Sequence, residues 1–173
     1  DIALAQSENL NMSLSMGGLQ ALNHTDHANR GRALDSFYER WNGSALVMEK
    51  WLMLSASSAV HGYIANIKAL MRDPVFDASN PNKLRSVLGV LDAANPTYFH
   101  KSDGSGYRFI AEELVNLDKR NPQIAARMGL ALTRFSNYGE ERQQQMRDAV
   151  KFVAGHALSR DLNEVISKAL KSA

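Results

Sequence analysis

Apolar residues recur at helical spacing along almost the whole chain, and this pattern limits the possible folds more than any other feature. Residues at positions i, i+3, i+4 and i+7 are apolar in six segments: 34–41, 60–67, 84–91, 107–114, 146–153 and 162–169. Such a stripe is typical of an amphipathic helix that buries one face. No segment alternates apolar and polar residues for long enough to indicate a strand. The sequence therefore predicts an all-α fold of about eight or nine helices.

Three of the four prolines directly follow an asparagine, in the pairs Asn80-Pro81, Asn95-Pro96 and Asn121-Pro122. An asparagine side chain at the N-cap accepts a hydrogen bond from a free backbone N–H, and proline suits the first helical position. Each pair therefore predicts a helix start. Asn80 and Asn121 are 41 residues apart, close to the period of two-helix HEAT repeats. We predict antiparallel helix pairs stacked in a HEAT/ARM-like curved array, an α-solenoid.

Composition narrows the class of protein. A chain of 173 residues with 45% hydrophobic and 22% charged residues predicts one globular domain over residues 1–173. No apolar run is long enough to span a membrane. Basic and acidic residues, 20 against 18, are interspersed, so no basic stripe indicates nucleic-acid binding. The absence of cysteine suits a cytoplasmic protein. Because the sequence begins with Asp1 and not with Met, we expect a fragment of a larger chain.

Motifs for catalysis or metal binding are weak. The stretch "HTDH" places His24 and His27 near a carboxylate, but it reads as a loop between helices and lacks further ligands. No HExxH, Walker A or Gly-x-Ser-x-Gly motif occurs. The stretch "KSDGSGYRF" predicts a tight turn that starts a helix, with Asp103 or Ser105 as its cap. From its own residues, we predict that this chain is not an enzyme and binds no metal.

The helix that follows Asn121-Pro122 carries the most informative polar residues. Its predicted buried stripe consists of Ile124, Met128, Ala131 and Phe135. Gln123 and Arg127 fall on another face, one turn apart. Spacing alone leaves two interpretations open: an ordinary solvated face, or a face that contacts a ligand.

Several segments together resemble the C-terminal end of bacterial aminopeptidase N, a member of the gluzincin zinc aminopeptidases. They are "ALVMEKW" (45–51), "SNPNKLRS" (79–86), "NPTYFHKSDGSGYRF" (95–109), "RNPQIAARM" (120–128) and "ISKAL" (166–170). The resemblance runs from about Ala33 to Leu170 and is weaker over the first 30 residues. The stretch "AGHALSRDLNE" (154–164) departs from the family pattern in length.

The resemblance implies a role that the residues alone do not. These enzymes remove N-terminal residues from peptides with one zinc, held by HExxH and a distant glutamate that lie upstream of the resembling segment. It implies that this chain holds no cofactor, is inactive alone, and forms the distal half of the helical C-terminal domain. That domain encloses a chamber above the active site, so the implied partners are the catalytic domain of the same parent chain and its peptide substrates.

The resemblance also implies which residues of this chain lie near the substrate. The positions that match Arg85, Gln123 and Arg127 face the chamber and border the substrate subsites in the resembling enzymes. The alternative is a free-standing helical-repeat module for protein interactions that shares only ancestry with them. An HExxH motif in sequence upstream of Asp1 would distinguish the two hypotheses.

Overall fold

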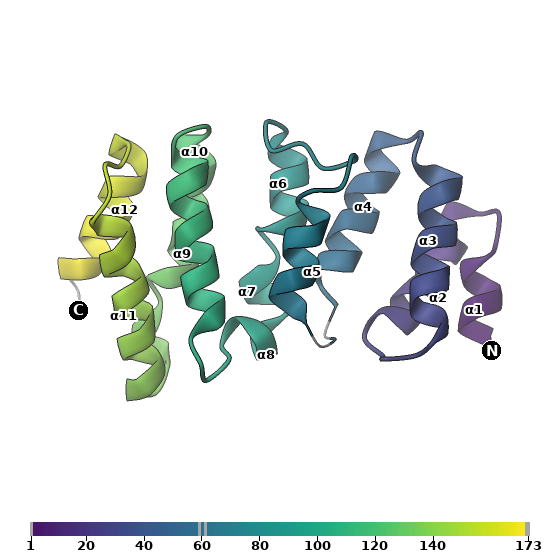
Figure 1. The fold of residues 1–173 in the computed structure, drawn as a ribbon, viewed down its shortest axis with the longest axis horizontal. Helices are drawn as coiled ribbons and strands as arrows, with labels where there is room; N and C mark the ends of the chain where they lie inside the picture. The colour runs from purple at the N-terminus through teal and green to yellow at the C-terminus, as the bar shows by residue number, and fades with distance from the viewer. Residues whose placement is uncertain (1, 59, 61, 172–173) are drawn as a thin grey trace. The chain divides into compact units, whose positions relative to one another are not determined.

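Helices and their connecting turns account for the fold in the computed structural model, which describes residues 2–58, 60 and 62–171 (Figure 1). No strand occurs among these residues, so the all-α prediction is confirmed. The chain divides into two compact units, Asp1–Asn95 and Pro96–Ala173, and each is described by itself. The prediction of one domain over residues 1–173 stays a prediction.

The first unit contains helices α1 to α7. Their bounds are α1 Ile2–Ser7, α2 Met12–Asn23, α3 Asn29–Trp41, α4 Ala45–Ala56, α5 Tyr63–Leu70, α6 Pro81–Val87 and α7 Leu91–Ala94. Helix α1 packs on α2, α3 packs on α2 and α4, and α4 packs on α5 and α6. Phe37, Leu52 and Ile67 are fully buried, so the stripes predicted from the sequence do form the core of this unit.

The second unit contains α8 to α12 and two 3-10 turns. Their bounds are α8 Pro96–Phe99, α9 Ser105–Asp118, α10 Pro122–Gly129, η1 Leu130–Leu132, η2 Phe135–Asn137, α11 Glu140–Ala154 and α12 Arg160–Lys171. Helix α9 packs against α10 and α11, and α12 packs against the same two helices. Tyr107, Leu114, Val150 and Ile166 have no exposed surface or almost none.

Twelve α-helices occur in the described part of the chain, more than the eight or nine predicted. The additional helices are short, and a helix of four to six residues cannot show a two-turn stripe. The stripe at 84–91 belongs to two helices, because α6 ends at Val87 and α7 begins at Leu91. Val60 also lies outside its predicted helix, since α5 begins at Tyr63, after Gly62 in the left-handed conformation.

The Asn-Pro pairs begin helices in all three places, but only two of the asparagines act as predicted. The side-chain oxygen of Asn80 accepts hydrogen bonds from the N–H groups of Asn82 and Lys83, at 2.9 and 3.4 Å. That of Asn121 accepts from the N–H of Ile124 at 3.2 Å. Asn95 caps no helix through its side chain. Its side chain points into the interior of the first unit, where only 2% of the residue is exposed.

Asn95 is the last member of a buried polar chain in the first unit. Its side-chain amide donates to the carbonyl of Ser58, and the Ser58 hydroxyl donates to the carbonyl of Asn23 at 2.9 Å. The Asn23 amide in turn donates to the carbonyl of Leu54 at 2.7 Å. Asn23, Ser58 and Asn95 are all at most 2% exposed. These side chains therefore join α2, α4 and the residue before α8 through hydrogen bonds to backbone carbonyls.

In the second unit, a buried carboxylate joins two helix ends through hydrogen bonds. Asp118, at the end of α9, is 5% exposed and accepts hydrogen bonds from the N–H and hydroxyl of Ser159. The Ser159 oxygen accepts from the N–H of Leu162 at 3.2 Å, as an N-cap does. The end of α9 is thereby joined to the start of α12.

Two asparagine-to-aspartate changes should separate the two roles of the Asn-Pro pairs. Asn80→Asp keeps the oxygen that accepts from the helix, so the free energy of unfolding should change by less than about 0.5 kcal/mol. Asn95→Asp replaces a buried donor with a carboxylate against the Ser58 carbonyl, and should cost about 3 kcal/mol or more at neutral pH. The loss should shrink at acidic pH, because a protonated carboxyl can donate again. Urea denaturation at pH 7 and pH 4 measures the free energy of unfolding of each variant. Equal losses for the two variants would contradict the different roles assigned to Asn80 and Asn95.

Candidate functional site

Helix α10 carries two of the three site residues predicted from the sequence, Gln123 and Arg127, and its local sequence explains its position. It begins at Pro122, directly after the Asn121 cap, and runs for 8 residues to Gly129. Its buried face consists of Ile124, Ala125, Met128 and Gly129. Because α9 and α12 both pack against α10, this face is held from two sides. Gly129 marks the close approach of α12, since a Cβ there would meet the Leu162 side chain at 3.1 Å.

The helix ends earlier than the stripe predicted. Ala131 and Phe135 lie beyond α10, in or next to the 3-10 turns η1 and η2. Leu132, which the predicted stripe omitted, is fully buried, whereas Ala131 is only partly buried. The tighter winding of a 3-10 turn changes which side chain faces the core. Arg127 therefore lies in the last turn of α10, where the helix dipole stabilises a positive charge.

Gln123 and Arg127 are exposed on the face of α10 opposite to its core contacts. Within the described residues, neither side chain makes a hydrogen bond or ion pair with another residue. A guanidinium offers a planar set of donors that fits a carboxylate, and a glutamine amide both donates and accepts. The structure thus brings these two residues together, one turn apart, with their hydrogen-bonding groups unused.

Arg85, the third predicted site residue, belongs to the first unit. It is exposed on α6, and its guanidinium donates to the side-chain oxygen of Asn82 at 3.1 Å. Asn82 follows the Asn80-Pro81 helix start, so the local sequence that begins α6 also orients Arg85. This arginine keeps most of its donors for other partners, because a guanidinium carries five.

No group of three His, Cys, Asp or Glu side chains in the described part of the chain could hold a metal ion. His27 of the "HTDH" stretch accepts a hydrogen bond from the N–H of Asn29 at 3.1 Å, as the first turn of α3 begins. The site on α10 offers cationic and amide groups, which suit the binding of carboxylate and carbonyl oxygens.

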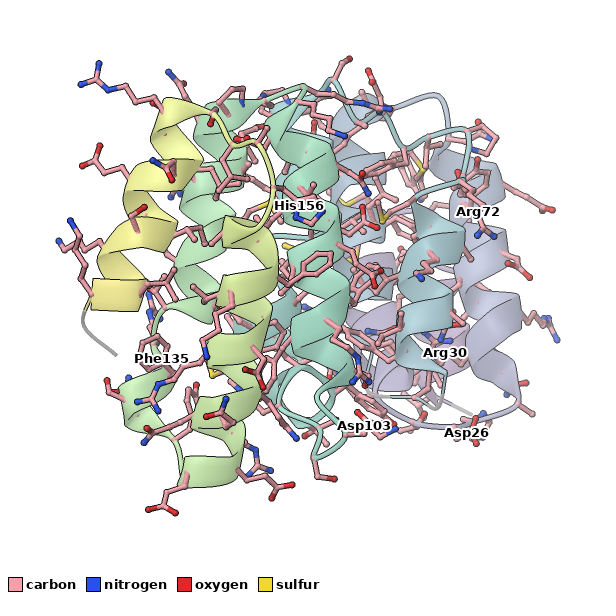
Figure 2. The ribbon with its side chains drawn as sticks, turned by 60° about the vertical axis from the view of Figure 1, so that its left-hand side comes forward. Asp26, Arg30, Arg72, Asp103, Phe135 and His156 are labelled. Carbon is pink, nitrogen blue, oxygen red and sulfur yellow. The ribbon has the colours of Figure 1, made fainter. Side chains whose placement is uncertain are left out.

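The predicted turn before α9 is present. Gly104 has a φ of 66° and precedes the first residue of α9, Ser105. The Asp103 carboxylate accepts from the Ser105 N–H at 2.9 Å, and the Lys101 ammonium lies 2.8 Å from it. The Lys101 and Ser105 hydrogen bonds hold the pKa of Asp103 well below its usual range. Asp103 is thus a turn residue at the exposed end of α9 (Figure 2).

The sequence reasoning missed a hollow of about 270 Å³ between α9 and α11. Its lining consists of Gly104, Arg108, Ala111, Glu112, Gln145, Asp148, Ala149 and Phe152. Ala111 and Ala149 are the small residues that leave this space open. The available signal was Phe152, an aromatic residue off the buried stripe of α11 that is 46% exposed.

Comparisons with known proteins now place the chain among its relatives. A family described as a domain of unknown function (DUF3458_C) with ARM repeats matches residues 1–171. Aminopeptidase N of Escherichia coli (strain K12) is 37% identical over 161 residues, which is 92% of this chain and 18% of that protein. Aminopeptidase N of Haemophilus influenzae is 37% identical over 162 residues, which is 93% of this chain and 19% of that protein.

A solved structure agrees with these sequence relatives. The crystal structure of Legionella pneumophila aminopeptidase A in complex with aspartic acid matches with a TM-score of 0.93 and 30% sequence identity. The match covers 99% of this chain and 20% of that one. This chain therefore spans about a fifth of the length of the relatives that it matches.

The exposed and buried faces of α10 should respond differently to truncation. Gln123→Ala and Arg127→Ala should each change the free energy of unfolding by no more than about 0.5 kcal/mol, as at other surface sites. Met128→Ala, one residue from Arg127 but 9% exposed, should cost about 2 kcal/mol or more because it leaves a cavity. Chemical denaturation of the three variants measures this. A loss of several kcal/mol for Arg127→Ala would make it a structural arginine.

Proposed function

Because this chain belongs to the DUF3458_C family of ARM-repeat domains, we propose that it is the non-catalytic C-terminal helical domain of a zinc-dependent aminopeptidase N. The chain is homologous to the C-terminal part of aminopeptidase N, a peptidase. In the proposed role it encloses the chamber above the active site and shapes the access of peptide substrates. The parent enzyme removes N-terminal amino acids from peptides.

One observation carries the proposal for substrate contact. Gln123 and Arg127 lie on a helix held by α9 and α12, are exposed, and have no hydrogen-bond or ionic partner among the described residues. Groups held rigidly with free donors suit recognition, because little flexibility is lost on binding. We propose that Gln123 and Arg127 in the second unit, and Arg85 in the first, each bind carboxylate or carbonyl oxygens of a peptide beyond its first residues.

The proposed partner for the rest of the surface is the catalytic domain of the same parent chain. Three large apolar side chains near the start of the chain support contact with further protein: Ile2, Leu10 and Leu14 are 87%, 85% and 50% exposed. Large apolar side chains with this exposure are available for burial against a partner. No helix among the described residues is long and apolar enough to cross a membrane. A cytoplasmic location for the parent is part of the proposal.

The zinc of the proposed parent does not fit the residues of this chain. The described side chains include no group of three metal ligands, and the sequence contains no HExxH. We therefore assign zinc, and every step that depends on it, to parts of the parent outside this chain.

Kinetics in the parent enzyme test the role of α10. Gln123→Ala and Arg127→Ala should lower kcat/KM for longer peptides by about threefold or more, in line with exposed charged contacts. They should leave single-residue reporter substrates nearly unchanged, because a short reporter does not reach this face. Arg160→Ala, which removes an exposed arginine of the same unit, is the matched control. Equal effects on short and long substrates would refute the chamber role, and no effect on either would favour the interaction-module alternative.

The isolated chain of residues 1–173 should hydrolyse no aminoacyl reporter and should bind no stoichiometric zinc, because it lacks a ligand set. Elemental analysis after dialysis and a reporter assay measure the two expectations. One tightly bound zinc per chain would contradict the proposal and direct attention to His24 and His27.

A further inference from the structure

A second surface feature of the first unit, a groove of about 320 Å³, is separate from the residues discussed above. It lies between α3, α4, α5 and the turn that follows α5. Its lining includes Gly31, Asp35, Trp51, Ser55, Asn66 and Asp73. This volume is at the lower end of those of ligand pockets, so the groove fits one side chain, not a whole peptide.

Gly31 keeps the groove open. It lies in the first turn of α3, and a Cβ built on it would meet no atom within 4 Å. Glycine is a weak helix former, and here no close packing requires it. The space beside Gly31 is therefore open, and a larger side chain at this position could enter the groove.

Two carboxylates from different elements line the groove. The Asp73 carboxylate is held in place: it accepts from the N–H of Val75 at 2.9 Å and from the hydroxyl of Tyr38 at 3.2 Å. Asp35, one turn before Glu39 on α3, is exposed and makes no ionic contact with the described residues. Burial and the neighbouring Asp73 raise the pKa of Tyr38, so its hydroxyl stays a donor.

The groove also contains Arg30, whose positive charge offsets only one of the two carboxylates. The Arg30 guanidinium donates to the backbone carbonyl and the side-chain oxygen of Asn23, at 3.1 and 3.2 Å. Arg30 lies on α3, in the first unit (Figure 2). No ion pair joins it to Asp35 or Asp73 in the described part of the chain. The groove therefore keeps an excess of negative charge.

The floor of the groove is aromatic and contains an unused polar group. The Trp51 indole N–H donates to the Leu34 carbonyl at 3.1 Å, and its ring meets the Tyr38 ring edge-on, with centroids 5.0 Å apart. Ser55, one turn further along α4, is 7% exposed, and its hydroxyl has no hydrogen-bond partner among the described residues. Buried hydroxyls are usually satisfied, so this one points to a missing partner.

We propose that this groove binds a guanidinium or ammonium group carried on an apolar stem, as in the side chain of arginine or lysine. The stem would lie against Trp51 and Leu70, while Asp35 and Asp73 would accept hydrogen bonds from the cation. Long basic side chains combine these two properties, since their methylene groups cover apolar surface and their charged ends stay polar. The proposal does not depend on the aminopeptidase assignment.

The probe is N-acetyl-arginine amide, titrated into the full 173-residue chain and followed by ¹H–¹⁵N NMR. The chain has two tryptophans, so the Trp51 indole N–H is one of only two such signals. We expect saturable shifts with a Kd on the order of 1 mM, as for other small ligands of few atoms. N-acetyl-citrulline amide, which has nearly the same shape without the charge, should bind at least about threefold more weakly.

Variants locate the binding in the groove. Asp35→Asn and Asp73→Asn should each weaken binding by about threefold or more, whereas Glu39→Gln, an exposed acid one turn away on α3, should not. Gly31→Leu should abolish binding by filling the space, with no fall in melting temperature, because leucine favours the helix. Circular dichroism confirms that each variant is folded.

Each outcome decides the question. No saturable shift, equal binding of the citrulline analogue, or equal loss in Glu39→Gln and Asp35→Asn would overturn the proposal. A parallel titration with agmatine, a small free amine that carries the same guanidinium, distinguishes a peptide side chain from a free amine as the ligand. Tighter binding of the capped arginine points to a peptide side chain, and tighter binding of agmatine points to a free amine.

Discussion

Backbone groups at buried helix ends impose the constraint on which the packing of the first unit depends. A helix of ordinary length leaves its last carbonyls without internal partners, and water cannot reach those that are buried. Here the side chains of Asn23, Ser58 and Asn95 reach across long stretches of sequence to these carbonyls. A hydrogen bond of this kind contributes about 0.5–1.5 kcal/mol, so three links are a substantial part of the net stability of a small domain.

The second unit meets the same constraint with a charge. The buried Asp118 accepts two hydrogen bonds from Ser159, which also caps α12. Because α12 and α9 both hold α10, the position of Gln123 and Arg127 depends on this link. The proposed substrate-facing side chains thus depend on a residue, Ser159, that lies far from them in the sequence. A rigid support and unused polar groups are what a binding surface requires.

The two surfaces described here differ in charge and in origin. On α10, exposed cationic and amide groups are left without partners, which suits anionic or carbonyl oxygens. In the groove of the first unit, two carboxylates and an indole surround a space left open by Gly31, which suits a cation. Both surfaces are built on a helical framework, and the groove shares the buried Trp51 and Ser55 with the interior of the first unit.

Helical class, the main stripes and two N-caps follow from the sequence alone, because they depend on spacing within one turn and on the chemistry of Asn-Pro. The exposed face of Gln123 and Arg127 was also predictable from that spacing. Local pattern did not reveal the end of α10 at Gly129 or the break between α6 and α7, since packing decides where a helix stops. Asn95 shows the limit most clearly. Its dipeptide is identical to the two caps, yet its amide turns inward, because only the folded first unit brings the unsatisfied Ser58 carbonyl within its reach. The sequence by itself determined the helical class and the main buried faces, and tertiary structure decided where the helices end, which polar groups hold them and which remain free to bind.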